Sequence, residues 1–263
     1  MKRNLKLILT LLKLRLSHLM VFRLSFFGAF FVDGSMFVIQ LLLFDVLYSQ
    51  VASIGGWQRG EMIIFIGTFS LINALNMSTF FFGLISIPDK IRTGALDHYL
   101  TKPSNTLLRL SFEQINPGSL PLIAMSLLII ARGVSLLPSP PAPLAVMGYI
   151  FLVLLMTLLW YDLMLLLRTA PFFLTSAATV HQIEESLIEL SMKVPGVVFE
   201  GIWKILFQVV LPYGLMATLP TQMLTGTLTL PGLAWGSGVA VLFTLFTLRF
   251  WKFGLSRYKS ASS

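Results

Sequence analysis

The chain has 263 residues, of which 56% are hydrophobic and only 11% are charged, and its mean hydropathy is +0.84. A soluble domain carries about 25% charged residues, so this composition excludes a water-soluble protein and predicts a polytopic membrane protein. Cysteine is absent, which excludes disulfides and thiolate metal sites. In a membrane chain, the net charge of +8 indicates orientation and contact with anionic lipid headgroups rather than binding to nucleic acid.

Residues 1–23 carry six basic side chains and no acidic one. Lys2, Lys6 and Lys13 fall on one stripe of a helix, while leucines cover its other faces. This pattern predicts an amphipathic helix that lies in the cytoplasmic interface of the membrane. A signal peptide is the competing interpretation, but charges interrupt its apolar region and no small-residue cleavage site follows.

Two long apolar runs follow, at about residues 24–47 and 62–86. Each is long enough for a hydrocarbon core that needs about 20 residues. The first run contains Asp33 and the second contains Asn76, at a similar depth from their inner ends. Because a lone polar group is costly in lipid, they either hydrogen-bond across a packed helix pair or face a polar path through the membrane.

Residues 85–105 form the longest polar island between apolar runs. Six ionisable side chains fall within a short part of it: Asp89, Lys90, Arg92, Asp97, His98 and Lys102. Pro88 and Pro103 bracket the island, and each proline removes an amide donor and biases the preceding residue away from helix. The pattern predicts a short helix over residues 88–103, outside the bilayer, with Ile91 and Leu96 on its apolar side and its polar side open to a soluble partner.

The later part of the chain is less regular. Apolar runs at about residues 117–137 and 144–167 predict the third and fourth spans, and a run at 232–251 predicts the last one. Residues 169–193 are polar for a span, and residues 197–226 are interrupted by prolines. Either the first of these segments crosses and the second dips in and out from the outer face, or the first lies inside and the second crosses.

Basic residues favour the cytoplasmic side of a membrane. With both termini inside, 15 of the 19 Lys and Arg residues lie on the inside, and only Arg59, Arg132, Lys193 and Lys204 lie outside. This bias requires an even number of crossings, and six crossings fit. We therefore expect an all-α chain with a single transmembrane domain over residues 1–263, six transmembrane helices and a partly re-entrant outer segment.

The motifs of common catalytic sites are missing from the sequence. It has no glycine-rich phosphate-binding loop and no common zinc or serine hydrolase motif, so we expect neither catalytic residues nor ATPase activity in this chain. His181, Glu184 and Glu185 are of metal-ligating types, but a polar helix face explains them better and no metal is expected. Membrane-buried acids usually face a protein interior or a water-filled path, so Glu184, Glu185 and Glu189 either line such a path or are solvated at the interface.

Three stretches resemble one known family. Residues 91–103 read I-R-T-G-A-L-D-H-Y-L-T-K-P and resemble the R-x-G-x-L-(D/E)-x-x-L-x-(K/T)-P stretch of ATP-binding-cassette export permeases, the ABC-2 membrane family. Residues 211–226, with L-P-Y-G, L-P and L-T-G, are similar to a late stretch of that family. Residues 253–263 read F-G-L-S-R-Y-K-S-A-S-S and are similar to its G-L-x-x-Y-x-S-A-S ending.

The resemblance implies a six-span permease subunit that pairs with a second permease subunit, as a homodimer or a heterodimer, and binds separate ATPase subunits that hold ATP and Mg²⁺. In this family the loop after the second span is the coupling helix that docks on the nucleotide-binding subunit. This role falls on the following residues: Pro88, Asp89, Arg92, Thr93, Gly94, Asp97, Tyr99, Lys102 and Pro103. The resemblance also favours residues 169–193 as the fifth span.

The same resemblance implies a multi-pass protein of the bacterial plasma (inner) membrane with cytoplasmic N- and C-termini. Candidates for the translocation path are Asp33, Asn76, Glu184, Glu185 and Glu189. The alternative is a secondary transporter or channel that uses the intramembrane carboxylates for ion coupling. The absence of an inverted repeat and of matching broken spans argues against that alternative.

Overall fold

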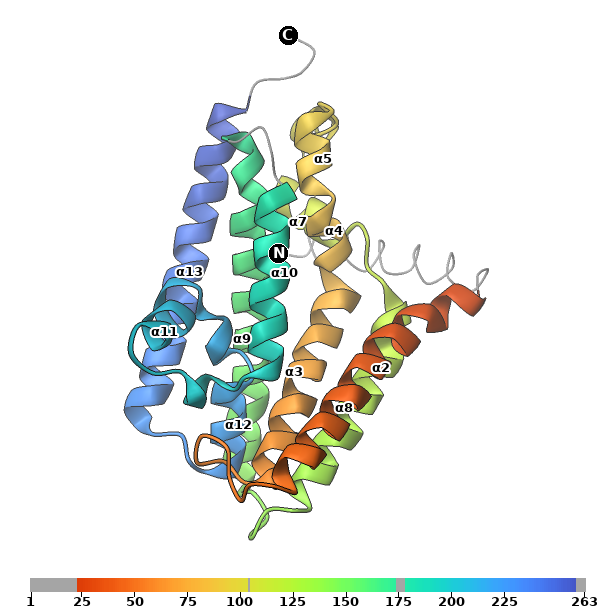
Figure 1. The fold of residues 1–263 in the computed structure, drawn as a ribbon. Coiled ribbons are helices and arrows are strands. Elements are labelled where there is room, and N and C mark those ends of the chain that lie inside the picture. The colour runs from red at the N-terminus through yellow and green to blue at the C-terminus, as the bar shows by residue number, and fades with distance from the viewer. Residues whose placement is uncertain (1–22, 104, 174–177, 259–263) are drawn as a thin grey trace.

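The computed structural model describes residues 23–103, 105–173 and 178–258 (Figure 1). These residues are almost wholly helical, with one isolated β-bridge between Ile54 and Trp57. The long helices are α2 (Arg23–Tyr48), α3 (Arg59–Thr79), α8 (Leu120–Val134), α9 (Pro143–Thr169), α10 (Ala178–Lys193) and α13 (Leu230–Arg257). The interfacial helix predicted over residues 1–23 lies outside the described residues except for its last position.

Within the described part of the chain, five segments are long and apolar enough to cross a membrane. They are Phe31–Tyr48, Arg59–Thr79, Pro117–Val134, Pro143–Phe172 and Leu230–Arg257. These segments correspond to the first four predicted spans and the last one. Counting a bent pair of helices as one span raises the number to six. The all-α, polytopic membrane fold predicted from the sequence is therefore confirmed.

The central helix of the bundle is α3, which lies between α2 and α8 on one side and α9 and α10 on the other (Figure 1). Two glycines let it pack directly on the backbone of α8. A Cβ atom on Gly67 of α3 would stand 2.9 Å from the amide nitrogen of Ile130, and one on Gly133 of α8 would stand 2.8 Å from that of Ile64. Small residues at such a crossing permit close van der Waals packing, which drives helix association in lipid.

Residues 196–226 form a series of short helical segments before the last span. They are η3 (Gly196–Val198), α11 (Gly201–Ile205), the π-helical η4 (Leu206–Val210), η5 (Pro212–Leu215) and α12 (Thr218–Thr225). Gly201–Val210 and Pro212–Thr225 are bent by 84° relative to each other. Both ends of the series lie beside the loop after α2, because a Cβ on Gly55 would meet Val198 at 2.9 Å and Gly226 lines the same pocket as Gly56. The series therefore enters and leaves at one end of the bundle, as expected for a re-entrant segment.

The remaining long helix, α10, returns along the bundle from the end of α9. In its first half, Glu184 forms an ion pair with Arg168 of α9. Near its end, the carbonyl of Met192 accepts a hydrogen bond from Gln40 Nε2 of α2. This direction is compatible with the fifth span predicted over residues 169–193, of which α10 covers the later part. Because α10 is not among the described segments that are long and apolar enough to cross a membrane, that span stays a prediction.

The prediction of a single helix over residues 88–103 was wrong. In the structure α3 continues through α4 (Phe81–Ile85) into α5 (Ile87–Arg92), with a one-residue break before each, and a separate α6 (Asp97–Leu100) follows. Pro88 does not separate the island from the span, because it lies in the first turn of α5, where a missing amide donor is tolerated. After α6 the chain forms α7 (Thr106–Phe112) and then η1 (Pro117–Ser119), which leads into α8.

Candidate functional site

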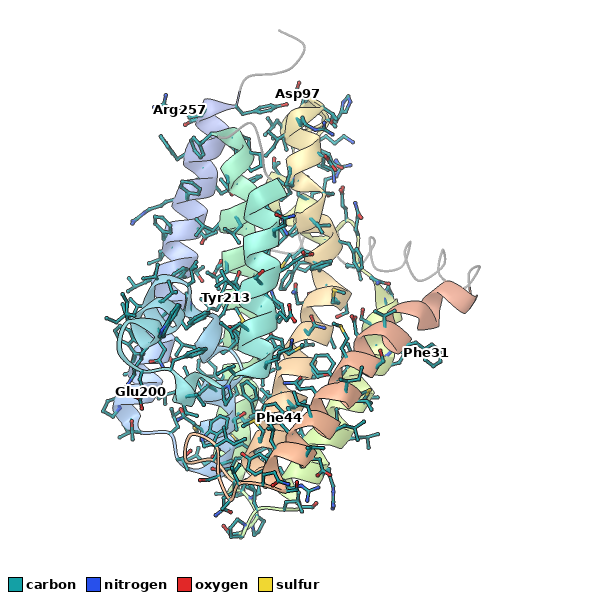
Figure 2. All side chains as sticks on the ribbon, viewed as in Figure 1. Phe31, Phe44, Asp97, Glu200, Tyr213 and Arg257 are labelled. Carbon is teal, nitrogen blue, oxygen red and sulfur yellow. The ribbon has the colours of Figure 1, made fainter. Side chains whose placement is uncertain are left out.

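The polar island forms a compact projection at the end of the bundle away from the re-entrant segment (Figure 1). We call it the polar head and define it as residues 87–113 without residue 104, which comprises α5, α6, α7 and the turns between them. Figure 2 shows Asp97 at its tip and Arg257, in the last turn of α13, at the same end of the bundle, whereas Glu200 lies toward the opposite end. The polar head contains every residue that the sequence assigned to docking, from Pro88 to Pro103.

Gly94 allows the chain to turn between α5 and α6. Its φ is +74°, in the left-handed region that residues with a Cβ rarely adopt. The amide of Leu96 then donates to the carbonyl of Lys90 at 3.1 Å, and the Leu96 side chain is fully buried. The glycine of the I-R-T-G-A-L sequence is thus required by the backbone of the turn.

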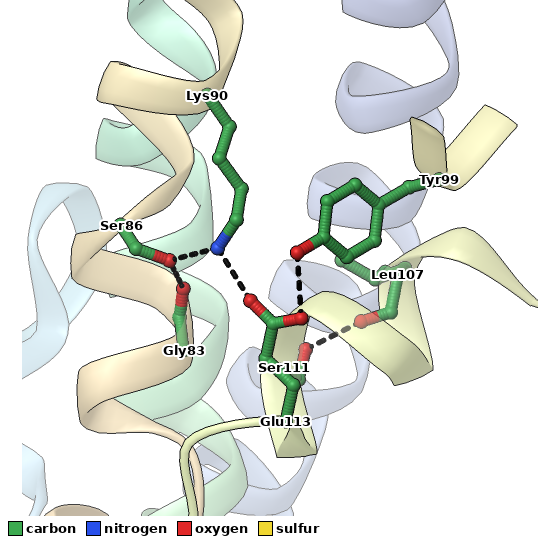
Figure 3. Close-up of polar contacts among 7 residues, drawn as sticks. All are labelled: Gly83, Ser86, Lys90, Tyr99, Leu107, Ser111 and Glu113. Atoms are coloured by element: carbon green, nitrogen blue, oxygen red, sulfur yellow. Dashed lines mark hydrogen bonds and ion pairs between the residues drawn. The ribbon is translucent and has the colours of Figure 1, made fainter. Parts of the chain in front are cut away.

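The side chain of Glu113, just after α7, joins α5 to α6 (Figure 3). Lys90 Nζ on α5 donates to Glu113 Oε1 at 2.5 Å, and the hydroxyl of Tyr99 on α6 donates to Glu113 Oε2 at 2.7 Å. Lys90 Nζ also donates to Ser86 Oγ at 2.6 Å. The side chains of Lys90 and Glu113 are only 14% and 17% exposed, so water screens their attraction weakly. One carboxylate therefore makes the two short helices a single rigid unit.

Two cations lie over the ring of Tyr99. The guanidinium of Arg109 is 4.9 Å from the ring centroid and Lys90 Nζ is 5.3 Å from it, both within cation–π range. Burial, with a smaller contribution from the hydrogen bond to Glu113, raises the pKa of Tyr99 to about 12. The hydroxyl therefore stays protonated at neutral pH and donates to Glu113. These inward contacts give Tyr99 a bracing role within the predicted docking segment.

The outer side of the polar head is open to solvent. The side chains of Asp89 and Arg92 are 77% and 78% exposed and form an ion pair at 3.4 Å, three residues apart on α5. Such exposed pairs contribute little to stability, so these charges are available to a binding partner. The exposed predicted docking residues are Asp89, Arg92, Thr93, Lys102 and Pro103, whereas Pro88, Gly94, Asp97 and Tyr99 are half-buried.

The end of the last span also contacts the polar head. The ring of Tyr258 packs edge-on against Phe172 of η2 (Ala170–Phe172), with ring centroids 5.9 Å apart, and its hydroxyl faces Asp97. Burial and the nearby Asp97 raise the pKa of Tyr258. A Cβ on Gly254 would stand 2.6 Å from a ring carbon of Phe172, so a glycine is needed where α13 approaches η2. The G-L-x-x-Y sequence thus places the tyrosine that follows α13 against the polar head.

Asp33 and Asn76 do not form the cross-helix hydrogen bond that was one of their two interpretations. Asn76 is fully buried, and both polar atoms of its side chain, like Asp33 Oδ2, lack a hydrogen-bond partner within the described ranges. The reason is geometric, because α2 diverges from α3 toward its N-terminal end (Figure 1). That interpretation was wrong, and a place on the translocation path remains a prediction for both residues.

The acids of α10 divide into two kinds. Glu184 and Arg168 form an ion pair at 2.6 Å, with only 2% and 5% of their side chains exposed. Glu189 pairs with Lys193 at 2.5 Å on the exposed side of the helix, and Glu185 is also exposed. A carboxylate already paired with a buried guanidinium is unsuited to exchange ions, which disfavours the secondary-transporter alternative at Glu184. Over the described residues, no group of three His, Cys, Asp or Glu side chains could hold a metal ion.

Sequence reasoning missed the residues that brace the site. Glu113 lies 14 residues after Tyr99 and 23 after Lys90, and such separations leave no periodic signature. The available signal was its chemistry, since an acid in an otherwise amphipathic stretch needs a partner when it is half-buried. The same reasoning connects Arg168, a lone cation at the end of the fourth span, with the acids that follow it.

Comparison with known proteins agrees with this architecture. The model of a family described as ABC-2 family transporter protein matches residues 35–262, which include α3, the polar head, the re-entrant segment and α13. No curated protein and no solved structure matches the chain significantly. Because the family match covers most of the chain, this protein belongs to the ABC-2 family of transporter proteins, the membrane components of ABC transporters.

Proposed function

We propose that this chain is the permease subunit of an ATP-driven exporter and that a separate nucleotide-binding subunit works it through the polar head. ATP and Mg²⁺ bind to that ATPase partner, whose motion moves substrate outward across the membrane. The supporting observation is that the polar head is both exposed and rigid: Asp89 and Arg92 face solvent, while Glu113 ties the two short helices together.

Rigidity matters because a flexible loop would absorb the motion of the ATPase. A push on the polar head reaches α3 through α4 and α5, which continue it with single-residue breaks. It also reaches α13, because Tyr258 faces Asp97. A partner that contacts the polar head differently in its open and closed states shifts the balance between inward-facing and outward-facing arrangements of these spans.

The orientation follows from the same proposal. The polar head and both termini lie in the cytoplasm of a bacterial cell, and the re-entrant segment lies at the outer face of the inner membrane. A second permease subunit, identical or related, completes the transporter. The buried amide of Asn76 and the carboxyl of Asp33, neither fully hydrogen-bonded among the described residues, are polar groups that the translocation path can use.

A charge exchange on the polar head tests the docking. In the double variant Asp89→Lys/Arg92→Asp, the two residues keep their i,i+3 pairing, while the pattern presented to the ATPase is reversed. The tagged full-length chain is purified from its native membrane, and co-purified chains are identified by mass spectrometry with ATPase activity measured in the same fraction. We expect the wild type to retain an ATPase subunit and the double variant to lose it.

The matched control is the exchange Glu189→Lys/Lys193→Glu on α10, an exposed pair outside the polar head. This control keeps the ATPase if docking is specific to the polar head. A head variant that retains the subunit and its activity at the wild-type level contradicts the proposal.

A further inference from the structure

A cavity of about 500 Å³ lies between α2, α3 and α8, and its lining includes the outer-end residues Tyr48 and Arg59. Its volume is within the range of small-molecule sites. Most of its lining is aliphatic or aromatic, and the side chains of Phe44 and Met62 are buried. Figure 2 shows Phe44 on the half of α2 that is distant from the polar head.

The cavity has an opening on the side of the bundle, between α2 and α8. Leu42 on α2 and Leu128 on α8 line it, yet they are 62% and 73% exposed, so they stand at its mouth. Both helices belong to segments that are able to cross a membrane, so this mouth faces hydrocarbon. The acyl chains of the bilayer therefore have direct access to the apolar part of the cavity.

The charged residues that line the cavity indicate that its ligand also carries a negative charge. Three charged residues line it, and two of them, Asp45 and Arg59, form an ion pair with each other. The third, Arg132, has no ion-pair partner among the residues that the structure describes. The lining therefore carries one uncompensated positive charge. A guanidinium is suited to bind a phosphate through two parallel hydrogen bonds.

We propose that this cavity binds an anionic phospholipid, with one acyl chain between α2 and α8 and its phosphate against Arg132. The inference rests on the membrane fold and not on docking of an ATPase. It assigns the cavity to a resident lipid of the surrounding bilayer, not to the transported molecule. Loss of the proposed docking would leave this binding unchanged, so the two proposals fail separately.

Native mass spectrometry of the purified full-length chain in detergent tests the proposal. The probes are phosphatidylglycerol and phosphatidylcholine with identical dioleoyl chains, added at equal concentration. We expect the wild type to retain phosphatidylglycerol about tenfold better, because both lipids carry a phosphate but the choline cation of phosphatidylcholine cancels its charge beside Arg132. The variant Arg132→Gln loses this preference, and Leu42→Trp, which places a bulky ring at the mouth, reduces retention of both lipids.

Arg249→Gln is the matched control, because Arg249 is an exposed arginine on α13 that does not line the cavity. It should behave as the wild type. Equal retention of phosphatidylglycerol by wild type and Arg132→Gln overturns the proposal, as does an equal loss in Arg249→Gln, which indicates general surface charge. Displacement of the lipid by glycerol 3-phosphate alone also overturns it, because the site then recognises a free phosphate and not a lipid.

Discussion

Lys90 and Tyr99 lie on two different short helices, and both donate to the carboxylate of Glu113, at 2.5 and 2.7 Å. The three side chains make the turn at Gly94 a rigid corner instead of a hinge. A partner that presses on α5 therefore moves α6 with it. This relationship is the mechanical basis of the proposed coupling, and it is open to direct measurement.

Replacing Glu113 by Gln should loosen the polar head. The variant keeps the shape of the side chain but leaves the largely buried Lys90 without a counter-charge. We expect a loss of about 1–3 kcal/mol of stability and faster hydrogen exchange in α6. Thermal unfolding and hydrogen exchange with mass spectrometry check this. The double variant Lys90→Met/Glu113→Gln should regain part of the loss, and unchanged exchange in the single variant would count against the brace.

The hydroxyl of Tyr99 should make the polar head sensitive to alkaline pH. Its pKa in the folded protein is about 12, above the ordinary value of about 10. The stability that this protonated hydroxyl adds to the folded protein is therefore fully present below pH 10, and it is lost as the pH rises toward 12. The tyrosinate absorbance of the wild type minus that of Tyr99→Phe should show one group titrating near pH 12. A difference with a midpoint near pH 10 would mean that the hydroxyl of Tyr99 is neither buried nor held by Glu113.

Gly94→Ala should destabilise the turn between α5 and α6. A residue with a Cβ at φ +74° costs about 1–2 kcal/mol, so we expect a lower thermal midpoint and weaker association with the ATPase subunit. Gly238 on α13 is the control, since a Cβ there meets nothing within 4 Å and helix propensity favours alanine. If both alanine variants unfold like the wild type, the turn does not depend on its glycine.

The apolar side of the polar island was predictable because it depends on local spacing. Ile91 and Leu96 were expected on one side, and the structure buries Leu96 fully and Ile91 partly, while Asp89 and Arg92 are exposed. The break at Gly94 was not predicted. A glycine inside a helical pattern is compatible with either a continuous helix or a turn. The turn is the form in which Leu96 is buried in the hydrophobic core, and that tertiary packing is not visible in local sequence.

Pairs of residues that are distant in the sequence could not be predicted from local spacing. Asp33 and Asn76 were considered as partners from similar depth alone, but depth does not give the direction in which α2 leans. Arg168 and Glu184 do form a pair, between α9 and α10. In the sequence they are recognisable only as a lone cation and an acid that follows it. The relevant rule is that an acid within a membrane helix needs a partner, and it identifies the pair once α10 is known to pack beside α9.

The buried ion pair between Arg168 and Glu184 should be the most sensitive polar contact between α9 and α10. Both side chains are nearly inaccessible, so Glu184→Gln leaves an uncompensated guanidinium inside the bundle. Breaking such a pair costs about 3–5 kcal/mol, and we expect a large fall in the thermal midpoint or failure to accumulate in the membrane. Glu189→Gln removes the exposed partner of Lys193 on the same helix and should cost less than about 1 kcal/mol.

A double replacement separates the structural role of this pair from a transport role. Arg168→Met/Glu184→Leu removes both charges, and apolar residues of similar size often replace a buried pair without loss of stability. We expect this variant to regain most of the stability lost in Glu184→Gln, as measured by thermal unfolding of the purified chain. If it is as unstable as the single variant, the two residues do not stabilise the bundle through each other. Arg168 neutralises Glu184. A stable double variant that still supports transport would therefore also show that the Glu184 carboxylate has no role in the translocation path.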